Sequence, residues 1–351
     1  MTTLPETTDE RATALAALSR TRALLDPGLR HWVGRLPGPV ARVASYHFGW
    51  TDSAGRPGAA PAGKALRPAL VFGCAEAVGA SAEEALAPAV AVELVHNFSL
   101  LHDDILDGDT TRRHRATAWA VFGSSAALLA GDALLVQASR VLTEDPPGRT
   151  RTVTGLRWLA DATTQLIEGE QTDIGFEERA HVSLAECLAM TERKTASLLA
   201  CSCALGALWG GGSAERIESL RRFGIHLGMA FQLVDDLLGI WGDPAVTGKP
   251  AGADLASRKK SLPVVAALDS GTPAGRRLAE CYGPGRAPET GPDEIGRLAD
   301  LVAEAGGRAW AEEAAEREFA QALECLRAAA PSEPAAAALA ALARLACRRD
   351  R

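Results

Sequence analysis

Three aspartates near residue 105 have a spacing that suits the binding of a divalent cation. Asp103, Asp104 and Asp107 occupy positions i, i+1 and i+4 in the segment LVHNFSLLHDDILDGDTTRRHRATAW, residues 94–119. On a helix, Asp103 and Asp107 lie one turn apart on one face. Like charges at this spacing repel each other, and the C-terminus of a helix adds further negative charge. A divalent cation would relieve both penalties, and Mg²⁺ is typically held by one or two carboxylates together with substrate phosphates.

A second acidic pair repeats this arrangement further along the chain. Asp235 and Asp236 follow an apolar run in FQLVDDLLGIWGD, residues 231–243, and Gly239 and Gly242 should end the helix. Either cluster alone is as well explained by a solvated helix end. Two clusters on apolar helices, each followed by basic residues, indicate a metal–phosphate site.

Basic residues beside helix ends and Gly/Pro loops could supply the other half of such a site. Arg binds phosphate through two hydrogen bonds, whereas Lys acts as a compact charge. Any one of them is more often a solvated surface charge, but as a set they predict two diphosphate pockets. The candidates are Lys64, Arg67, Arg112, Arg113, Lys194, Lys249, Lys259 and Lys260.

Helices should position these residues. Of the 351 residues, 47% are hydrophobic and only 5% are aromatic, and no stretch shows the alternation of a strand. Apolar-periodic segments are separated by Gly/Pro-rich breaks near residues 145, 210, 243 and 284. We expect an all-α protein with a polar arm at residues 1–20 and one helical domain at residues 21–351, containing roughly ten to thirteen helices.

Composition argues against several other classes of protein. The net charge is −7 without a long basic run, so no nucleic-acid partner is expected. The seven cysteines are scattered, which suits a reduced cytoplasm, and the first residues lack the features of a signal peptide. The longest apolar stretch, residues 85–101, is interrupted by Glu93, His96 and Asn97. We therefore interpret it as a buried core helix and expect no membrane span.

From about Lys64 to Pro263 the sequence resembles the trans-isoprenyl diphosphate synthases, or polyprenyl synthetases, and most of all bacterial geranylgeranyl diphosphate synthases. The motifs that carry the resemblance are GKxLRP, DDxxD followed by RR, KTA, FQxxDD and GKxxxxDLxxxKxxLP, in this order. The resemblance implies an orthogonal helical bundle of the isoprenoid synthase type around a central apolar cavity. It also implies a homodimer that condenses isopentenyl diphosphate with an allylic diphosphate through ionisation, alkene attack and proton loss.

Roles for single residues also follow from the resemblance. Three Mg²⁺ ions, which Mn²⁺ would be able to replace, would be bound by Asp103, Asp107 and Asp235, with Asp104 and Asp236 behind them or holding bridging waters. The isopentenyl diphosphate site would consist of Lys64, Arg67, His96 and Arg113. The cationic partners of the allylic diphosphate would be Arg112, Lys194, Lys249 and Lys259. The developing allylic cation would be stabilised by Lys194, Thr195 and Gln232.

The chemistry itself demands such a site. Breaking a C–O bond to diphosphate requires that the leaving group's charge be neutralised as it develops. The resulting cation must meet the alkene before water does, which requires a dry apolar cavity. One departure from the family pattern stands out, because Gly239 replaces the usual third aspartate of the second cluster. We expect retained activity with weaker metal binding.

Two residues upstream of the first cluster are expected to set product length. Phe98 lies five residues before an uninterrupted DDxxD motif, which in the family accompanies C20 products, and Ser99 lies one turn before Asp103. We therefore expect these two side chains to form a floor and the product to be geranylgeranyl diphosphate. Without the family, Phe98 is simply a core aromatic, and the smaller Val92 and Val95 leave longer products open.

Two other functions remain open. A class I terpene cyclase shares the fold and the first motif, but the chain lacks the N-D-x-x-S-x-x-x-E pattern and has basic residues for a second diphosphate. A regulatory prenyltransferase subunit should have lost its metal carboxylates, whereas this chain keeps those of the first cluster. The sequence does not indicate the preferred allylic starter or the pathway served.

Overall fold

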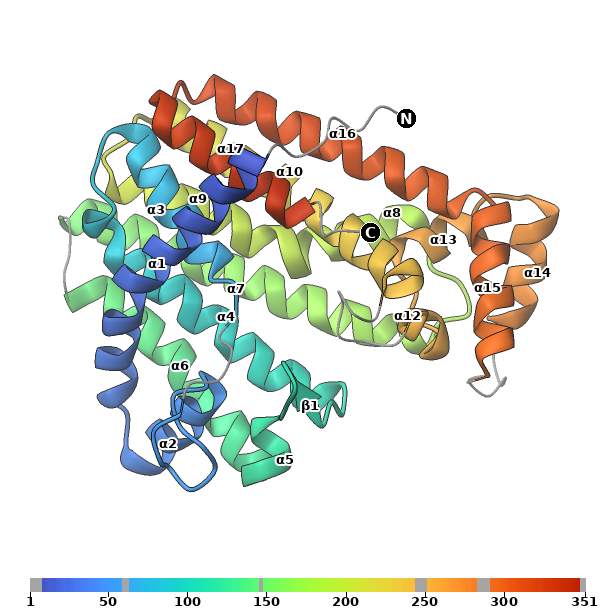
Figure 1. The fold of residues 1–351 in the computed structure, drawn as a ribbon, viewed down its shortest axis with the longest axis horizontal. Coiled ribbons are helices and arrows are strands. Elements are labelled where there is room, and N and C mark those ends of the chain that lie inside the picture. Colours follow the sequence, from blue (N-terminus) through green and yellow to red (C-terminus); the bar gives the residue numbers. More distant parts are fainter. Residues whose placement is uncertain (1–7, 59–62, 145–147, 244–250, 283–290, 348–351) are drawn as a thin grey trace. The chain divides into compact units, whose positions relative to one another are not determined.

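The computed structural model describes residues 8–58, 63–144, 148–243, 251–282 and 291–347, and they are almost entirely helical (Figure 1). The all-α prediction is confirmed. The chain forms two compact units. The first contains Met1–Asp161, Cys201–Arg221 and Arg327–Leu342, and the second contains Ala162–Ala200, Arg222–Leu326 and Ala343–Arg351. Each unit combines three separate stretches, so the units do not follow one another along the sequence.

The first unit is built around one buried helix. Its first helices are α1 (Thr8–Gly34), α2 (Gly38–His47), α3 (Leu66–Val78), the short 3₁₀ turn η1 (Glu83–Ala85), α4 (Leu86–Leu106), α5 (Ala118–Phe122) and α6 (Ser124–Glu144). Helix α4 contacts α1, α3 and α6. The prediction that residues 85–101 form a buried core helix is confirmed, since even Glu93 and Asn97 are buried there.

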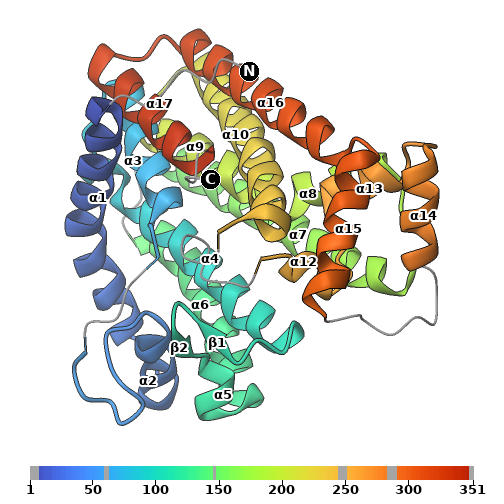
Figure 2. The ribbon, with the colours of Figure 1, turned by 45° about the vertical axis from the view of Figure 1, so that its right-hand side comes forward.

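A two-stranded hairpin follows α4. Strands β1 (Thr111–Arg112) and β2 (Arg115–Ala116) pair antiparallel, with Arg112 opposite Arg115. Figure 2 shows the hairpin beside α2, where Tyr46 Oη donates a hydrogen bond of 2.8 Å to the carbonyl oxygen of Ala116. No strand was expected here, because two residues are too short to show an alternating pattern.

The second unit is formed by later helices. They include parts of α7 (Arg149–Glu178), α9 (Ser197–Trp209), α10 (Ala214–Trp241), α16 (Gly307–Ala328) and α17 (Glu333–Cys347). They also include α8 (Leu184–Thr191), the π-helical turn η2 (Glu192–Ala196), α12 (Ala253–Ala256), α13 (Leu262–Leu268), α14 (Pro273–Cys281) and α15 (Pro292–Glu304). Apolar side chains such as Phe176, Leu233 and Leu262 form its core.

The structure differs in detail from two expectations about elements. The polar arm at residues 1–20 is helical from Thr8 onward, and Ala14 and Leu18 are buried at 0% and 9% exposure. These apolar residues form a narrow stripe between charged ones, which the composition of the segment conceals. The described residues also hold more helices than the expected ten to thirteen, because helices as short as α5 and α12 show no periodicity. The single domain at residues 21–351 stays a prediction.

Three helices of the described chain are long and apolar enough to cross a membrane. They are Glu83–Leu106, Ser124–Glu144 and Ala214–Trp241, and 67%, 44% and 56% of their most apolar windows are buried within the protein. For the first of these, burial among the helices of its own unit accounts for the apolar composition. The expected absence of a membrane span stays a prediction.

Candidate active site

The first acidic cluster lies at the C-terminal end of α4. The backbone N–H of Asp107 donates a hydrogen bond of 2.8 Å to the carbonyl oxygen of Asp103, which closes the last turn. Gly108 follows with φ +68° and ends the helix. Asp103 is half-buried and Asp107 is exposed. The two carboxylates therefore lie on one helical face with access to solvent.

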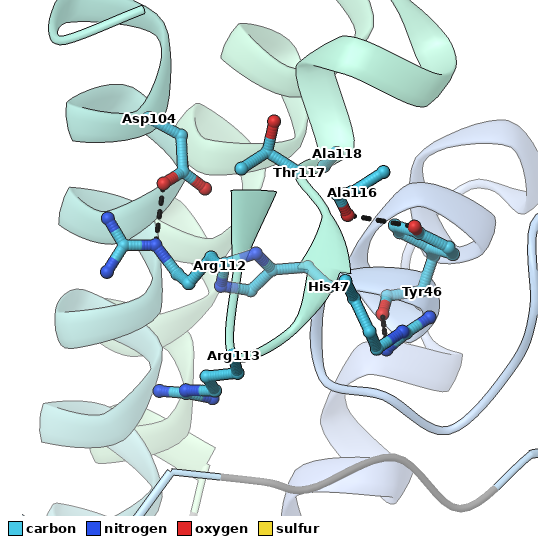
Figure 3. Close-up of a pocket in the computed structure, with 9 residues that line it drawn as sticks. Tyr46, His47, Asp104, Arg112, Arg113, Ala116, Thr117 and Ala118 are labelled. Carbon is cyan, nitrogen blue, oxygen red and sulfur yellow. Dashed lines mark hydrogen bonds and ion pairs between the residues drawn. The ribbon is translucent and has the colours of Figure 1, made fainter. Parts of the chain in front are cut away.

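Asp104 has a different environment from its neighbours. It is only 1% exposed, and Arg112 Nε donates a hydrogen bond of 2.6 Å to its Oδ1 atom (Figure 3). Burial raises the pKa of this carboxyl, although Arg112 opposes the shift. Its Oδ2 atom is buried without a hydrogen-bond partner. Asp104 thus fixes Arg112 in place.

The hairpin holds Arg113 in an unusual backbone conformation. Arg113 and His114 form the two-residue turn and have φ values of 52° and 61°, in the left-handed region. Such turns favour Asn and Gly, and two larger residues in this region are strained by about 1–3 kcal/mol each. The residue types at this turn therefore did not predict it. Strained residues of this kind persist where the surrounding structure fixes them.

Arginines gather around a neutral histidine in the first unit. Arg67 Nη1 donates a hydrogen bond of 3.3 Å to His96 Nε2. Burial, followed by repulsion from Arg67, Arg113 and Arg112, lowers the pKa of His96 well below its usual value. Burial also lowers the pKa values of Arg67 and Arg113, while Glu93 opposes both shifts. We call Arg67, His96, Arg112 and Arg113 the basic cluster.

Lys64 precedes the basic cluster at the entry to α3. It is exposed, and it is followed by Ala65, which caps α3 in the left-handed conformation with φ 53°. The neighbouring Gly63 lies directly against Arg113, because a Cβ atom on Gly63 would come within 2.5 Å of Arg113 Nη2. The four residues predicted to bind isopentenyl diphosphate thus all belong to the first unit.

A small pocket opens beside the hairpin (Figure 3). It is lined by Tyr46, His47, Asp104, Arg112, Arg113, Arg115, Ala116, Thr117 and Ala118. Arg115 has a structural role, because it donates hydrogen bonds to the carbonyl oxygens of Tyr46 and Thr51 and lies 4.4 Å from the centre of the Tyr46 ring. Burial, followed by repulsion from Arg113 and Arg112, lowers the pKa of His47 to about 3.

The two residues predicted to form the floor lie on different faces of α4. Ser99 is one turn before Asp103, and its Oγ donates a hydrogen bond of 2.9 Å to the carbonyl oxygen of His96. Phe98 is 5% exposed, and its ring meets His102 edge-on with 4.7 Å between centroids. Gly131 on α6 makes room for His102, since a Cβ atom there would lie 2.5 Å from the imidazole.

In the second unit, Asp236 anchors a chain of hydrogen bonds. Its Oδ1 accepts from Gln232 Nε2 at 2.8 Å and its Oδ2 accepts from the Leu262 N–H at 2.9 Å. Thr195 Oγ1 in turn donates to Gln232 Oε1 at 2.8 Å. Burial raises the pKa of Asp236 to about 6. Both carboxylate oxygens of Asp236 accept hydrogen bonds within the protein. Asp235, the preceding residue on α10, is half-buried.

Lys194 is held by two carboxylates. Its Nζ lies 2.8 Å from Glu170 Oε2 and 2.6 Å from Asp173 Oδ2. Burial lowers the pKa of Lys194, but the two carboxylates outweigh it and raise the pKa to about 12. The sequence motifs did not identify Glu170 and Asp173 as partners of Lys194. Their spacing of three residues along α7 is the signal that could have identified the pair.

A glycine brings α7 against the π-helical turn that carries Lys194 and Thr195. A Cβ atom on Gly169 would lie 2.4 Å from the backbone nitrogen of Lys194. π-helical turns are rare and frequent at functional sites. The close approach of backbone to backbone explains how the Lys194 side chain reaches the carboxylates of α7.

The position of the missing third aspartate is filled from elsewhere in the second unit. A Cβ atom on Gly239 would lie 2.4 Å from Asp254 Oδ2, so a carboxylate already lies beside this turn of α10. Burial lowers the pKa of Lys259, but Asp236 and Asp254 outweigh it and raise the pKa overall. Lys260 is buried and donates to the Phe176 carbonyl oxygen at 2.5 Å, which is a structural contact. Lys249 lies outside the described residues.

The aspartates alone would supply only part of the coordination shell of Mg²⁺. Among the described residues, no three His, Cys, Asp or Glu side chains lie close enough to hold an ion together. The pair Asp103 and Asp107 offers hard oxygen ligands on one face, and Mg²⁺ usually completes its shell with waters and substrate phosphates. The donor set therefore fits an ion that binds together with a diphosphate. Asp104, whose Oδ1 accepts a hydrogen bond from Arg112, and Asp236, whose two oxygens both accept hydrogen bonds, fit a supporting role.

Comparisons with known proteins place the chain in a family. The family model described as "Polyprenyl synthetase" matches residues 50–297. A (2E,6E)-farnesyl diphosphate synthase of Mycobacterium tuberculosis (strain ATCC 25618 / H37Rv) is 47% identical, over 94% of this chain and 92% of the relative. A geranylgeranyl diphosphate synthase of the same strain is 44% identical, over 95% and 94%. The chain belongs to the polyprenyl synthetase family, and it is a prenyltransferase.

A solved structure agrees with this assignment. The crystal structure of a polyprenyl synthetase from Streptomyces coelicolor A3(2) has a TM-score of 0.90 and 46% sequence identity, over 95% of this chain and 99% of that one. The isoprenoid synthase type of helical fold, which the resemblance implied, is therefore confirmed.

Proposed function

We propose that this prenyltransferase joins isopentenyl diphosphate to an allylic diphosphate with the help of Mg²⁺. The observation that carries the proposal is the arrangement of the first unit. There the Asp103–Asp107 pair and three members of the basic cluster lie on α4 and the hairpin that follows it, and the fourth member, Arg67 of α3, meets His96 at 3.3 Å. Cations crowded around a neutral histidine suit a polyanion, and two carboxylates on one helix face suit its metal ions.

Different residues would bind isopentenyl diphosphate and the metal ions. Lys64, Arg67, His96 and Arg113 are the proposed ligands of isopentenyl diphosphate. Mg²⁺, bound through Asp103, Asp107 and Asp235, would neutralise charge on the leaving diphosphate.

The allylic diphosphate would be held by four cations. Lys194 stays protonated because Glu170 and Asp173 raise its pKa. Its proposed companions are Arg112, Lys249 and Lys259. The oxygens of Thr195 and Gln232, fixed by their mutual hydrogen bond of 2.8 Å, would stabilise the cation that forms when the C–O bond breaks.

Activity is tested with radiolabelled isopentenyl diphosphate, Mg²⁺ and C5, C10 or C15 allylic starters. We expect longer labelled diphosphates in the complete mixture and none after chelation of the metal. Chromatography of the products identifies their length and the preferred starter. A cyclic hydrocarbon formed from one allylic diphosphate without isopentenyl diphosphate would show a terpene cyclase instead.

For the product we propose geranylgeranyl diphosphate. Phe98 supports a C20 product because its buried ring is held by contact with His102, whose Nε2 lies 3.1 Å from the Leu128 carbonyl oxygen of α6. A C15 product is the second candidate, since the relatives named above include a farnesyl diphosphate synthase at 47% identity and a geranylgeranyl diphosphate synthase at 44%. Replacing Phe98 by Ala should lengthen the product if the ring forms the floor, and an unchanged product would exclude this role.

We also propose that the protein is a cytoplasmic homodimer without a nucleic-acid partner or membrane span. Helix α6 supports dimerisation because Leu128, Leu129 and Val136 expose 45%, 58% and 63% of their surface, which is apolar area that a second copy could cover. Sedimentation equilibrium should give twice the chain mass. The Leu129→Glu variant should shift the mass toward one chain, and an unchanged dimer would exclude α6 from the interface.

A further inference from the structure

Helix α1 contributes an arginine to the surroundings of the basic cluster. Arg22 Nη2 donates a hydrogen bond of 2.6 Å to the carbonyl oxygen of Gly63, which is 41 residues away along the chain. Gly63 immediately precedes Lys64 at the entry to α3. Helix α1 therefore supplies a contact to one of the family motifs.

Gly63 also supports the Arg113 side chain. A Cβ atom on Gly63 would lie 2.5 Å from Arg113 Nη2, 3.0 Å from Cζ and 3.3 Å from Nη1, so the guanidinium lies across the glycine. Any movement of Gly63 would move the surface on which Arg113 rests and the start of the Lys64 backbone. Arg22 fixes Gly63 through the Gly63 carbonyl oxygen.

The charges around this contact link α1 to the basic cluster. Arg22 lies close enough to Arg113 to lower its pKa, after burial, which is the main cause of the shift. Asp26, one turn after Arg22 on α1, likewise contributes to the raised pKa of Glu93, whose main cause is also burial. The crowded positive charges of Arg22 and Arg113 would be relieved by a bound polyanion.

We propose that Arg22 is a positioning residue of the isopentenyl diphosphate site, which holds Lys64 and Arg113 in place through the Gly63 carbonyl. The proposal rests on the function proposed above. Arg22 acts through Gly63, so its loss should weaken one substrate and leave the other substrate and the chemical step unchanged.

The chain offers a matched control for this role. Arg20 lies two residues before Arg22 on α1 and forms an ion pair of 2.8 Å with Glu76 on α3. Both arginines therefore tie α1 to the α3 region, but only Arg22 contacts the segment that leads into the site. Replacing Arg20 by Ala tests whether loosening α1 is enough to impair binding.

The experiment measures KM for each substrate and kcat for Arg22→Ala, Arg22→Lys, Arg20→Ala and Arg67→Gln. We expect Arg22→Ala to raise the KM for isopentenyl diphosphate about tenfold, with kcat and the allylic KM within about twofold of wild type. Arg22→Lys should recover most of the affinity because it can donate to the same carbonyl. Arg20→Ala should behave as wild type, and thermal melting should confirm that all variants fold.

Several results would overturn the proposal. They are an unchanged isopentenyl diphosphate KM in Arg22→Ala, an equal rise in both KM values, an Arg22→Lys variant as weak as Arg22→Ala, or an Arg20→Ala variant with the same defect. The Arg67→Gln variant distinguishes a wrong role for Arg22 from a wrong proposed function. If Arg67→Gln raises the isopentenyl diphosphate KM and Arg22→Ala does not, only the role of Arg22 is wrong. If Arg67→Gln leaves that KM unchanged, the assignment of the site is wrong and the role of Arg22 fails with it.

Discussion

Neighbouring aspartates in this protein have opposite surroundings. Asp103 and Asp107 reach solvent on one face of α4, whereas Asp104 is buried against Arg112. The sequence predicted which residues carry charge and which share a helical face, because both follow from spacing alone. It could not identify Glu170 as a partner of Lys194, or Arg22 as a partner of Gly63, because these contacts depend on how separate helices pack.

Activity should be far more sensitive to removing the charge of Asp103 or Asp107 than to removing that of a nearby aspartate. We expect Asp103→Asn and Asp107→Asn each to lower kcat by about 100-fold or more, since each removes a ligand that acts on the leaving group. Asp109→Asn is the control, because this residue lies two positions after Asp107 and uses its backbone oxygen for the Thr117 and Trp119 hydrogen bonds. Comparable losses in all three variants, measured by steady-state kinetics, would contradict the metal role.

His47 should make the fold sensitive to acid. Its pKa is lowered from 6.5 to about 3. Below pH 6.5 this histidine therefore binds a proton in the unfolded chain but stays neutral in the folded chain. Stability is then complete above pH 6.5 and falls as the pH decreases, by about 2 kcal/mol at pH 5. Urea unfolding at pH 7.5 and 5 should show a smaller loss in His47→Gln than in wild type.

His181→Gln serves as the comparison for this measurement, because the His181 side chain is 73% exposed and pairs with Asp269 at the surface. It should keep the acid sensitivity of wild type. An equal loss of stability in wild type and His47→Gln would show that other groups cause the effect.

At the scale of elements, long helices were predictable and short or tightly packed ones were not. The apolar pattern of residues 85–101 was enough to predict a buried helix. The Arg113–His114 turn was not predictable, because its residues are not those that favour a left-handed backbone. The π-helical turn at Glu192–Ala196 packs against Gly169, a contact between separate helices that no local pattern records.

The contact between α7 and this turn gives a prediction with a control in the same helix. Gly169→Ala should lower the free energy of unfolding by about 1–3 kcal/mol and reduce activity, because its Cβ would displace the Lys194 backbone. Gly175→Ala should be neutral or stabilising by up to about 1 kcal/mol, since nothing lies within 4 Å of its Cβ position. Urea titration measures both, and a harmless Gly169→Ala would contradict the tight packing.

For the whole molecule, the division of the candidate ligands between units matters most. Asp103 and Asp107 belong to one unit and Asp235 to the other, and the described residues hold no group of three metal-binding side chains. Sequence motifs predicted the members of the site because each motif is local. The division into units made of interleaved stretches could not be predicted, because it follows from tertiary packing.

Metal and diphosphate should therefore stabilise the protein together more than separately. With the Mg²⁺–diphosphate complex at about 100 times its dissociation constant, the stabilisation should approach about 2.7 kcal/mol, whereas Mg²⁺ alone should give little. Thermal melting with Mg²⁺, with inorganic diphosphate and with both tests this expectation. A full shift of the melting temperature with Mg²⁺ alone would indicate a metal site that needs no substrate.

The glycine at position 239 affects how this enzyme could be engineered. Consensus design would restore the family's aspartate there, but the space for its side chain is already taken by the Asp254 carboxylate. The restored residue would add steric overlap and a second negative charge in the same place. Repairing the motif would thus require a simultaneous change at Asp254, so the two positions form one design unit.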